Sequence, residues 1–113
     1  MQNDIRKYLY DISNAIDSIY EYLGKNKNFK VYESNKLLRR AVERELEIIG
    51  EATNRIIKIS PSINIAEAQR IVNLRNWVIH SYDNVDNIII WGIINKDLPL
   101  LKKQVAYLLN SNK

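Results

Sequence analysis

An apolar stripe near the start of the chain places the strongest constraint on its fold. The stripe residues recur at alternating spacings of four and three positions: Ile5, Leu9, Ile12, Ile16, Ile19 and Leu23. This spacing puts every member on one side of an α-helix, so the segment from Asp4 to about Leu23 is predicted to be helical. Gly24 stands at a C-cap position, before a short polar connection over residues 25–28. A one-sided helix of this length must bury its apolar face against other elements.

Similar spacing predicts four more helices. They run from Val31 or Tyr32 to Ile59, from about Ala66 to Ser81, from about Asn87 to Asn95, and from Asp97-Leu98-Pro99 through Leu109. Gly50 lies inside the second of them, where the close approach of another helix would explain a glycine. A strand over residues 88–94 would need a partner strand, and no second segment alternates with period two. We therefore expect an all-α fold, a compact bundle of about five helices forming a single domain over residues 1–113.

Composition narrows the classes of function. The 113 residues include no cysteine, which excludes disulfides and thiolate metal sites. No basic leader and no membrane-spanning apolar run is visible, so the expected location is cytoplasmic, with no membrane contact. The formal charge of +4 favours polyanionic partners. The basic groups are interpreted as solvated helix faces and a polar loop: Lys25, Lys27 and Lys30; Lys36, Arg39, Arg40 and Arg44; Lys102 and Lys103.

One segment of the third helix combines residue types suited to phosphodiester chemistry: Arg75-Asn76-Trp77-Val78-Ile79-His80-Ser81-Tyr82. His80 is the only histidine of the chain, and histidine can both accept and donate a proton near neutral pH. Arg75 offers a fixed cationic fork to phosphate oxygens, and Tyr82 adds a phenolic donor. On RNA, His80 could take the proton of a 2′-hydroxyl or protonate the leaving 5′ oxygen, while Arg75 stabilises the phosphoryl charge. Such chemistry needs neither a metal nor a cofactor, and a structural or merely exposed histidine is the competing interpretation.

Helical geometry limits how these residues can meet. On an ideal α-helix, Arg75 and His80 are five positions apart and point about 140° away from each other around the helix axis. Tyr82, seven positions after Arg75, returns close to the face of Arg75. Convergence therefore requires a helix that ends near His80, or a second protomer that contributes its own copy of the segment. We expect both.

Two other groups of residues are assigned to ordinary structural roles. The acidic succession of Glu43, Glu45, Glu47 and Glu51 could hold a metal, but a solvated helix face is the favoured interpretation. Tyrosines cluster on the first helix at Tyr8, Tyr10, Tyr20 and Tyr22, where core edges are favoured over base stacking. The sequence contains no glycine-rich phosphate loop and no nucleophile elbow.

The arrangement Arg75-x4-His80-x-Tyr82 resembles the signature of the HepT-like toxin family within the HEPN superfamily. Residues 44–52 are similar to the second-helix segment of that family, and residues 83–101, with Ile90-Trp91 and Asp97-Leu98-Pro99, are similar to its C-terminal segment. The three segments occur in the family's order and comprise 36 of the 113 residues. One departure is that residues 62–65 lack a tryptophan expected before the motif.

The resemblance implies a homodimer in which two copies of the motif face each other as a metal-independent endoribonuclease site. By position, Arg75 and His80 become the catalytic pair, with Asn76 and Tyr82 as supporting residues. The resemblance also implies a partner, a minimal nucleotidyltransferase antitoxin that silences the toxin by transferring AMP to Tyr82.

Two alternatives remain open from the sequence. The chain could be a non-catalytic helical module whose Tyr82 is modified by a nucleotidyltransferase while no RNA is cut. It could also be a basic regulator that binds nucleic acid without His80, although no recognition helix after a tight turn is apparent.

Overall fold

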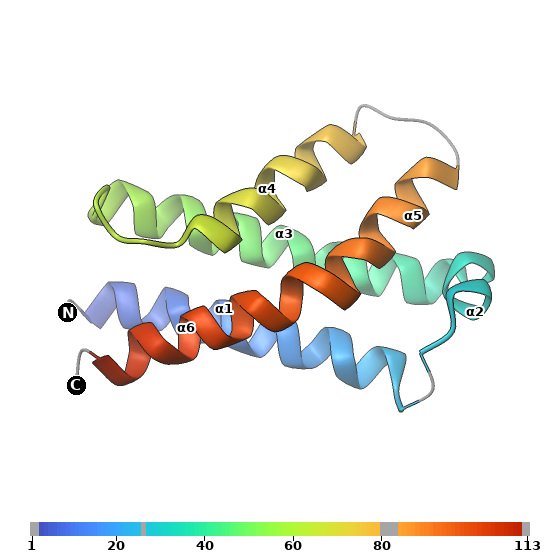
Figure 1. The fold of residues 1–113 in the computed structure, drawn as a ribbon, viewed down its shortest axis with the longest axis horizontal. Helices are drawn as coiled ribbons and strands as arrows, with labels where there is room; N and C mark the ends of the chain where they lie inside the picture. The colour runs from blue at the N-terminus through green and yellow to red at the C-terminus, as the bar shows by residue number, and fades with distance from the viewer. Residues whose placement is uncertain (1–2, 26, 80–83, 112–113) are drawn as a thin grey trace.

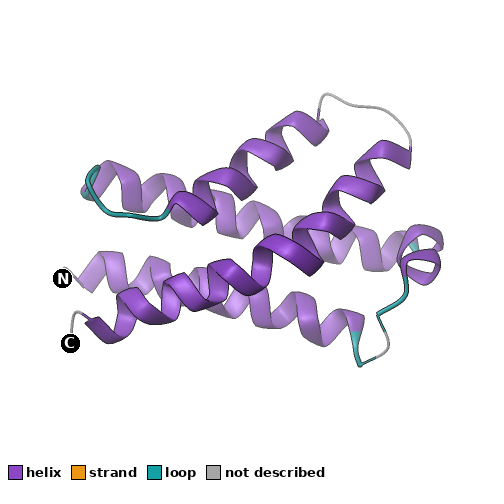
Figure 2. Ribbon diagram, in the orientation of Figure 1, coloured by secondary structure: helices purple, strands orange, loops and turns teal. Residues whose placement is uncertain are grey.

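The computed structural model describes residues 3–25, 27–79 and 84–111, and all regular structure within these ranges is helical (Figure 2). The elements are α1 (Asn3–Leu23), α2 (Phe29–Ser34), α3 (Lys36–Ile59), α4 (Ala66–Ile79), α5 (Asn84–Gly92), the π-helical segment η1 (Ile93–Asp97) and α6 (Leu98–Ser111). The prediction of an all-α fold is confirmed for this part of the chain. No helix of the described part is both long enough and apolar enough for a membrane span.

The core lies between α1 and α3, which run antiparallel and pack along most of their lengths, while α6 lies against α1 (Figure 1). The stripe that predicted α1 is the face that it buries. Five of its members are at most 5% exposed: Ile5, Leu9, Ile12, Ile16 and Ile19. Burying one such side chain contributes about 1.5–3 kcal/mol, so this face holds the helix in the bundle.

The predicted helix from Val31 or Tyr32 to Ile59 is wrong in one respect, because the chain forms two helices with a break at Asn35. Asn35 is extended, with φ −106° and ψ 97°, and its side-chain oxygen accepts a hydrogen bond from the Leu38 N–H at 3.0 Å. That bond satisfies a donor that every helix N-terminus leaves free. Apolar spacing alone missed the break because a cap of one residue barely disturbs the pattern.

The last two predicted helices are also corrected. The fourth begins at Asn84 rather than Asn87, and α5 continues through η1 into α6 without a break. Leu98 is helical and donates its N–H to the Ile93 carbonyl, an i to i−5 bond that defines a π turn. Asp97, where the fifth helix was predicted to begin, is instead a residue inside the continuous helix and is 4% exposed. The wider turn lies directly before Pro99, which cannot donate to the Asn95 carbonyl as an α-helix would require.

Helix α4 lies across α3 and connects to α5, and the linked ends of α4 and α5 stand away from α1 (Figure 1). Its start follows Asn64, whose side-chain oxygen accepts a hydrogen bond from the Ala66 N–H at 3.4 Å. Buried Ala68 and Ile71 hold its inner face against the core. The arrangement carries the C-terminal half of α4, where the predicted motif begins, to the edge of the bundle.

Candidate functional site

The predicted site residues fall on and just beyond α4. Arg75 and Asn76 lie in the C-terminal half of this helix, which ends at Ile79. His80 and Tyr82 lie outside the described residues. The third helix was expected to reach Ser81, and this predicted end also lies outside the described residues. Among the four predicted residues, the structure places the side chain of Asn76, which is exposed.

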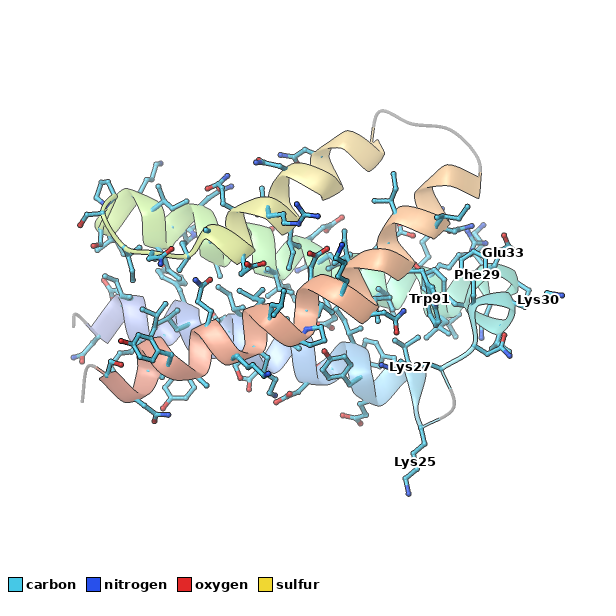
Figure 3. The ribbon with its side chains drawn as sticks, viewed as in Figure 1. Lys25, Lys27, Phe29, Lys30, Glu33 and Trp91 are labelled. Carbon is cyan, nitrogen blue, oxygen red and sulfur yellow. The ribbon has the colours of Figure 1, made fainter. Side chains whose placement is uncertain are left out.

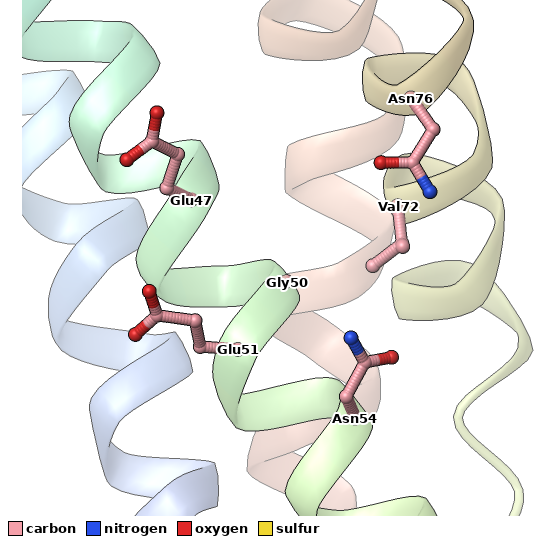
Figure 4. Close-up of a pocket in the computed structure, with 6 residues that line it drawn as sticks. All are labelled: Glu47, Gly50, Glu51, Asn54, Val72 and Asn76. Atoms are coloured by element: carbon pink, nitrogen blue, oxygen red, sulfur yellow. The ribbon is translucent and has the colours of Figure 1, made fainter.

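Asn76 lines a groove of about 240 Å³ between α3 and α4 (Figure 4). The walls consist of Glu47, Gly50, Glu51 and Asn54 from α3, and Val72 and Asn76 from α4. A Cβ atom built at Gly50 would meet Val72 Cγ2 at 3.8 Å, an ordinary van der Waals distance. Another helix does pass over Gly50, as expected, but an alanine would also fit there. The groove is polar along its length and opens beside the motif helix.

The α3 wall of this groove carries negative charge that Arg44 partly offsets. Arg44 Nη1 lies 3.3 Å from Glu47 Oε2 and 4.0 Å from Glu51 Oε1. The exposed fractions of the Glu47 and Glu51 side chains are 42% and 70%, so these pairs are solvated. No cluster of three metal-binding side chains occurs within the described ranges. The acidic succession is therefore a solvated face, as favoured from the sequence, and it would repel a phosphate placed against α3.

The tyrosines of α1 mostly serve the bundle. Tyr8 and Tyr20 pack against the core, and burial raises the pKa of the Tyr20 phenol above its usual value. Tyr22 is 43% exposed and donates its hydroxyl to Glu45 Oε2 at 2.8 Å. This hydrogen bond to a carboxylate, with smaller contributions from burial and charge, raises the pKa of Tyr22. The favoured assignment of these rings to core edges therefore holds for Tyr8 and Tyr20.

An ion pair that the sequence did not reveal fixes α4 on the bundle. Arg70 Nε donates to Asp97 Oδ1 at 3.0 Å, joining α4 to η1. The Asp97 side chain is 6% exposed, whereas that of Arg70 is 56% exposed, so the buried carboxylate depends on a cation that reaches in from the surface. The signal available in the sequence was an aspartate among Ile93, Ile94 and Leu98, all of them buried. Because Arg70 precedes Arg75 on one rigid helix, this pair also sets how the motif is presented.

The described part of the site offers amides and two solvated carboxylates but no imidazole. The amides of Asn54 and Asn76 lie on opposite walls of the groove and can each donate and accept hydrogen bonds (Figure 4). Such groups suit the edges of nucleobases, whereas Glu47 and Glu51 disfavour a phosphate on the α3 side of the groove. Proton transfer would have to come from the residues that follow α4.

Comparison with known proteins gives a consistent set of relatives. The family model described as "Ribonuclease HepT-like" matches residues 12–108. A protein of Methanocaldococcus jannaschii named "Putative RNase MJ1380" is 36% identical over 108 residues, which cover 92% of this chain and 95% of that protein. "Probable ribonuclease HepT" of Thermococcus cleftensis is 35% identical over 106 residues, covering 90% of this chain and 93% of that protein. No solved structure gives a significant match.

Proposed function

Because the chain belongs to the HepT-like ribonuclease family, we propose that it is an endoribonuclease whose catalytic residues are Arg75 and His80. The observation that carries the proposal is the family match over residues 12–108, which includes the whole of the motif. The position of Arg75 and Asn76 on the C-terminal half of α4, at the edge of the bundle, supports it. Asn76, beside the groove, is proposed to orient the phosphate or the histidine.

The proposed reaction is transesterification at phosphorus. The 2′-oxygen of the ribose forms a bond to phosphorus as the bond from phosphorus to the 5′ oxygen breaks. One His80 imidazole accepts the 2′-hydroxyl proton, and an imidazolium donates a proton to the leaving 5′ oxygen. Arg75 stabilises the negative charge that builds on the non-bridging oxygens. The products are a 2′,3′-cyclic phosphate and a 5′-hydroxyl, and no metal takes part.

A homodimer would complete this site. A single helix turns Arg75 and His80 about 140° apart, whereas two motif helices that face each other could supply the base and the acid from different protomers. The motif end of α4 stands at the edge of the bundle, away from α1, where a second copy could approach it (Figure 1).

Regulation is proposed to act through Tyr82. A minimal nucleotidyltransferase antitoxin would transfer AMP from ATP to the phenolic oxygen, with pyrophosphate as the leaving group. Because Tyr82 follows His80 by two residues, the added nucleotide would place bulk and a negative phosphate at the catalytic pair. The chain would then act as the toxin of a toxin and antitoxin pair in the cytoplasm.

The test is cleavage of a fluorescent single-stranded RNA in the presence of EDTA, by protein produced without the nucleotidyltransferase. His80→Ala is expected to lower the rate by about 10²- to 10⁴-fold, the usual contribution of general acid and base catalysis. Arg75→Ala should show a comparable loss, and Asn76→Ala a smaller one. Asn73→Ala, an exposed position one turn earlier on α4, is the matched control and should leave the rate unchanged.

Two further measurements distinguish the proposal from its alternatives. An RNA with a 2′-deoxy sugar at the cleaved position should remain intact, and incubation with the nucleotidyltransferase and ATP should add AMP masses to the wild type but not to Tyr82→Phe. Cleavage that persists in His80→Ala would contradict the assigned catalyst. Modification of Tyr82 without any RNA cleavage would instead identify a non-catalytic module.

A further inference from the structure

The connection between α1 and α2, together with the first turn of α2, carries three lysines with no acidic residue among them. Lys25, Lys27 and Lys30 are exposed, and none forms an ion pair with another described residue. Cations elsewhere in the described ranges do form such pairs, including Lys7 with Asp11, Arg40 with Glu43 and Lys102 with Asp17. Three unpaired positive charges within six residues leave a local field that attracts anions.

The backbone of this connection is held in place at both ends. Gly24 has φ 72°, the left-handed conformation that ends α1, and its N–H donates to the Tyr20 carbonyl at 3.0 Å. Asn28 caps α2, accepting hydrogen bonds from the Lys30 N–H at 2.9 Å and the Val31 N–H at 3.3 Å. Lys27 is positioned further by its Nζ, which lies 5.4 Å from the centre of the Tyr20 ring. A ligand would therefore meet Lys27 and Lys30 beside backbone and ring contacts that hold the described residues of this region.

Aromatic rings lie in the region of Lys27 and Lys30, while Lys25 lies farther out and points away from them (Figure 3). Phe29 meets Trp91 of α5 edge-on, with ring centres 5.8 Å apart, and both remain partly exposed. The buried ring of Tyr32 supports Trp91 from a centre distance of 5.4 Å. Half-buried Glu33 limits the basic region on one side, so the surface is a strip rather than a broad basic face.

We propose that the lysine and aromatic strip, formed by Lys25, Lys27, Phe29, Lys30 and Trp91, binds single-stranded RNA on one side of the cleaved bond. The lysines contact phosphates, and the exposed parts of Phe29 and Trp91 contact bases. Aromatic rings beside unpaired cations are the combination that single strands bind, because unpaired bases can stack while the backbone is neutralised. An acidic protein surface would use the lysines but would leave the rings without a matching partner.

The position of the strip fits a strand that also reaches the motif. Trp91 lies seven residues after Asn84, the first residue of α5, and thus about 10 Å along that helix. Since α5 follows the motif segment in the chain, Trp91 is the member of the strip that is nearest to the motif in sequence. The inference rests on the proposed ribonuclease function for its ligand, but it concerns binding and not cleavage.

The test measures binding separately from catalysis by using a fluorescein-labelled, fully 2′-O-methylated RNA that cannot be cleaved through its 2′ oxygen. The variant combines Lys25→Gln, Lys27→Gln and Lys30→Gln. The matched control combines Lys58→Gln, Lys96→Gln and Lys103→Gln, which removes the same charge from three exposed lysines elsewhere. A third variant, Phe29→Leu, keeps apolar packing against Trp91 but removes the ring.

Each phosphate contact changes the slope of log affinity against log salt by about 0.7 for a single strand, so loss of three contacts should reduce the slope by about 2. We expect this change, and affinity weakened tenfold or more at low salt, in the strip variant but not in the control. Phe29→Leu should weaken binding severalfold without changing the slope. On cleavable RNA, the strip variant should raise KM and leave kcat close to that of the wild type.

The outcomes distinguish the two proposals. Equal RNA affinities of the strip variant and the control would overturn the assignment of the strip, whether or not RNA is cleaved. Equal losses for duplex and single-stranded RNA would overturn the assignment to single strands. If RNA is never cleaved but the strip variant alone loses its affinity for the methylated strand, the strip assignment stands and the ribonuclease proposal fails.

Discussion

Replacing Arg70 with methionine should destabilise the protein far more than its exposed position suggests. The substitution keeps most of the aliphatic stem but leaves Asp97 Oδ1 without the donor that lies 3.0 Å away. Removing one partner of a buried ion pair costs about 3–5 kcal/mol. Because the Arg70 side chain is 56% exposed, water can partly replace it, and we expect a loss of about 2–3 kcal/mol in the free energy of unfolding.

A loss of that size is a large share of the roughly 5–15 kcal/mol that stabilises a typical domain. Urea titration followed by circular dichroism measures it, with the slope m compared between variants to verify that the transition remains two-state. The double variant Arg70→Met with Asp97→Leu should recover much of the loss, since it removes the buried charge along with its partner.

The matched control is Lys7→Met, which breaks the pair of Lys7 with Asp11 at the same distance of 3.0 Å. Both partners of that pair are solvated, at 67% and 38% exposure, so the expected cost is below about 0.5 kcal/mol. If Arg70→Met costs no more than Lys7→Met, the reasoning that a buried Asp97 depends on Arg70 is refuted.

Two further predictions concern Gly50 and Tyr32. Gly50→Ala should raise the free energy of unfolding by up to about 1 kcal/mol in urea titrations, because alanine favours the helix. Its Cβ would meet Val72 Cγ2 at an acceptable 3.8 Å. A lower free energy of unfolding would show that the groove has no room for the methyl group. Burial, and to a lesser extent Glu43, raise the pKa of Tyr32, so the folded state keeps this proton to higher pH than the unfolded chain. The contribution of this proton to the free energy of unfolding is complete below the pKa of the unfolded chain, about 10, and is lost as the pH rises further. Stability measured across that pH should fall less in Tyr32→Phe than in the wild type, and equal slopes would contradict this assignment.

The parts of the fold that depend on apolar spacing were predictable from the sequence. Helix α1 follows its stripe within one residue at the start and ends as predicted at Leu23. The break at Asn35 was missed because it depends on one side chain and one pair of backbone dihedral angles. A hydrophobic pattern averaged over several turns does not detect a change at one residue. Asn28 and Asn35 each precede a helix, so two asparagines seven residues apart were the available signal.

The family was predictable from the sequence, because three segments resemble it in the right order, and the family match confirms that prediction. Arg75 and Asn76 lie on the expected helix, while the roles of the site residues stay a prediction. The pairing of Arg70 with Asp97 spans 27 positions in the chain, and no local pattern indicates a contact over that separation. The charge of the groove likewise depends on how α3 and α4 pack.

The π turn at η1 lies directly before Pro99, one of the two prolines of the chain, and it holds one residue more than a regular α-helical turn would. A π turn is an α-helix that has absorbed one extra residue while the helices on both sides keep their packing. A relative one residue shorter at this place could restore a regular helix without moving α5 or α6. In that helix, however, the residue at the place of Pro99 would have to donate to a carbonyl four positions back, and proline cannot. Shortening by one residue and replacement of this proline should therefore occur together in the family, so that aligned sequences with the deletion carry another residue there.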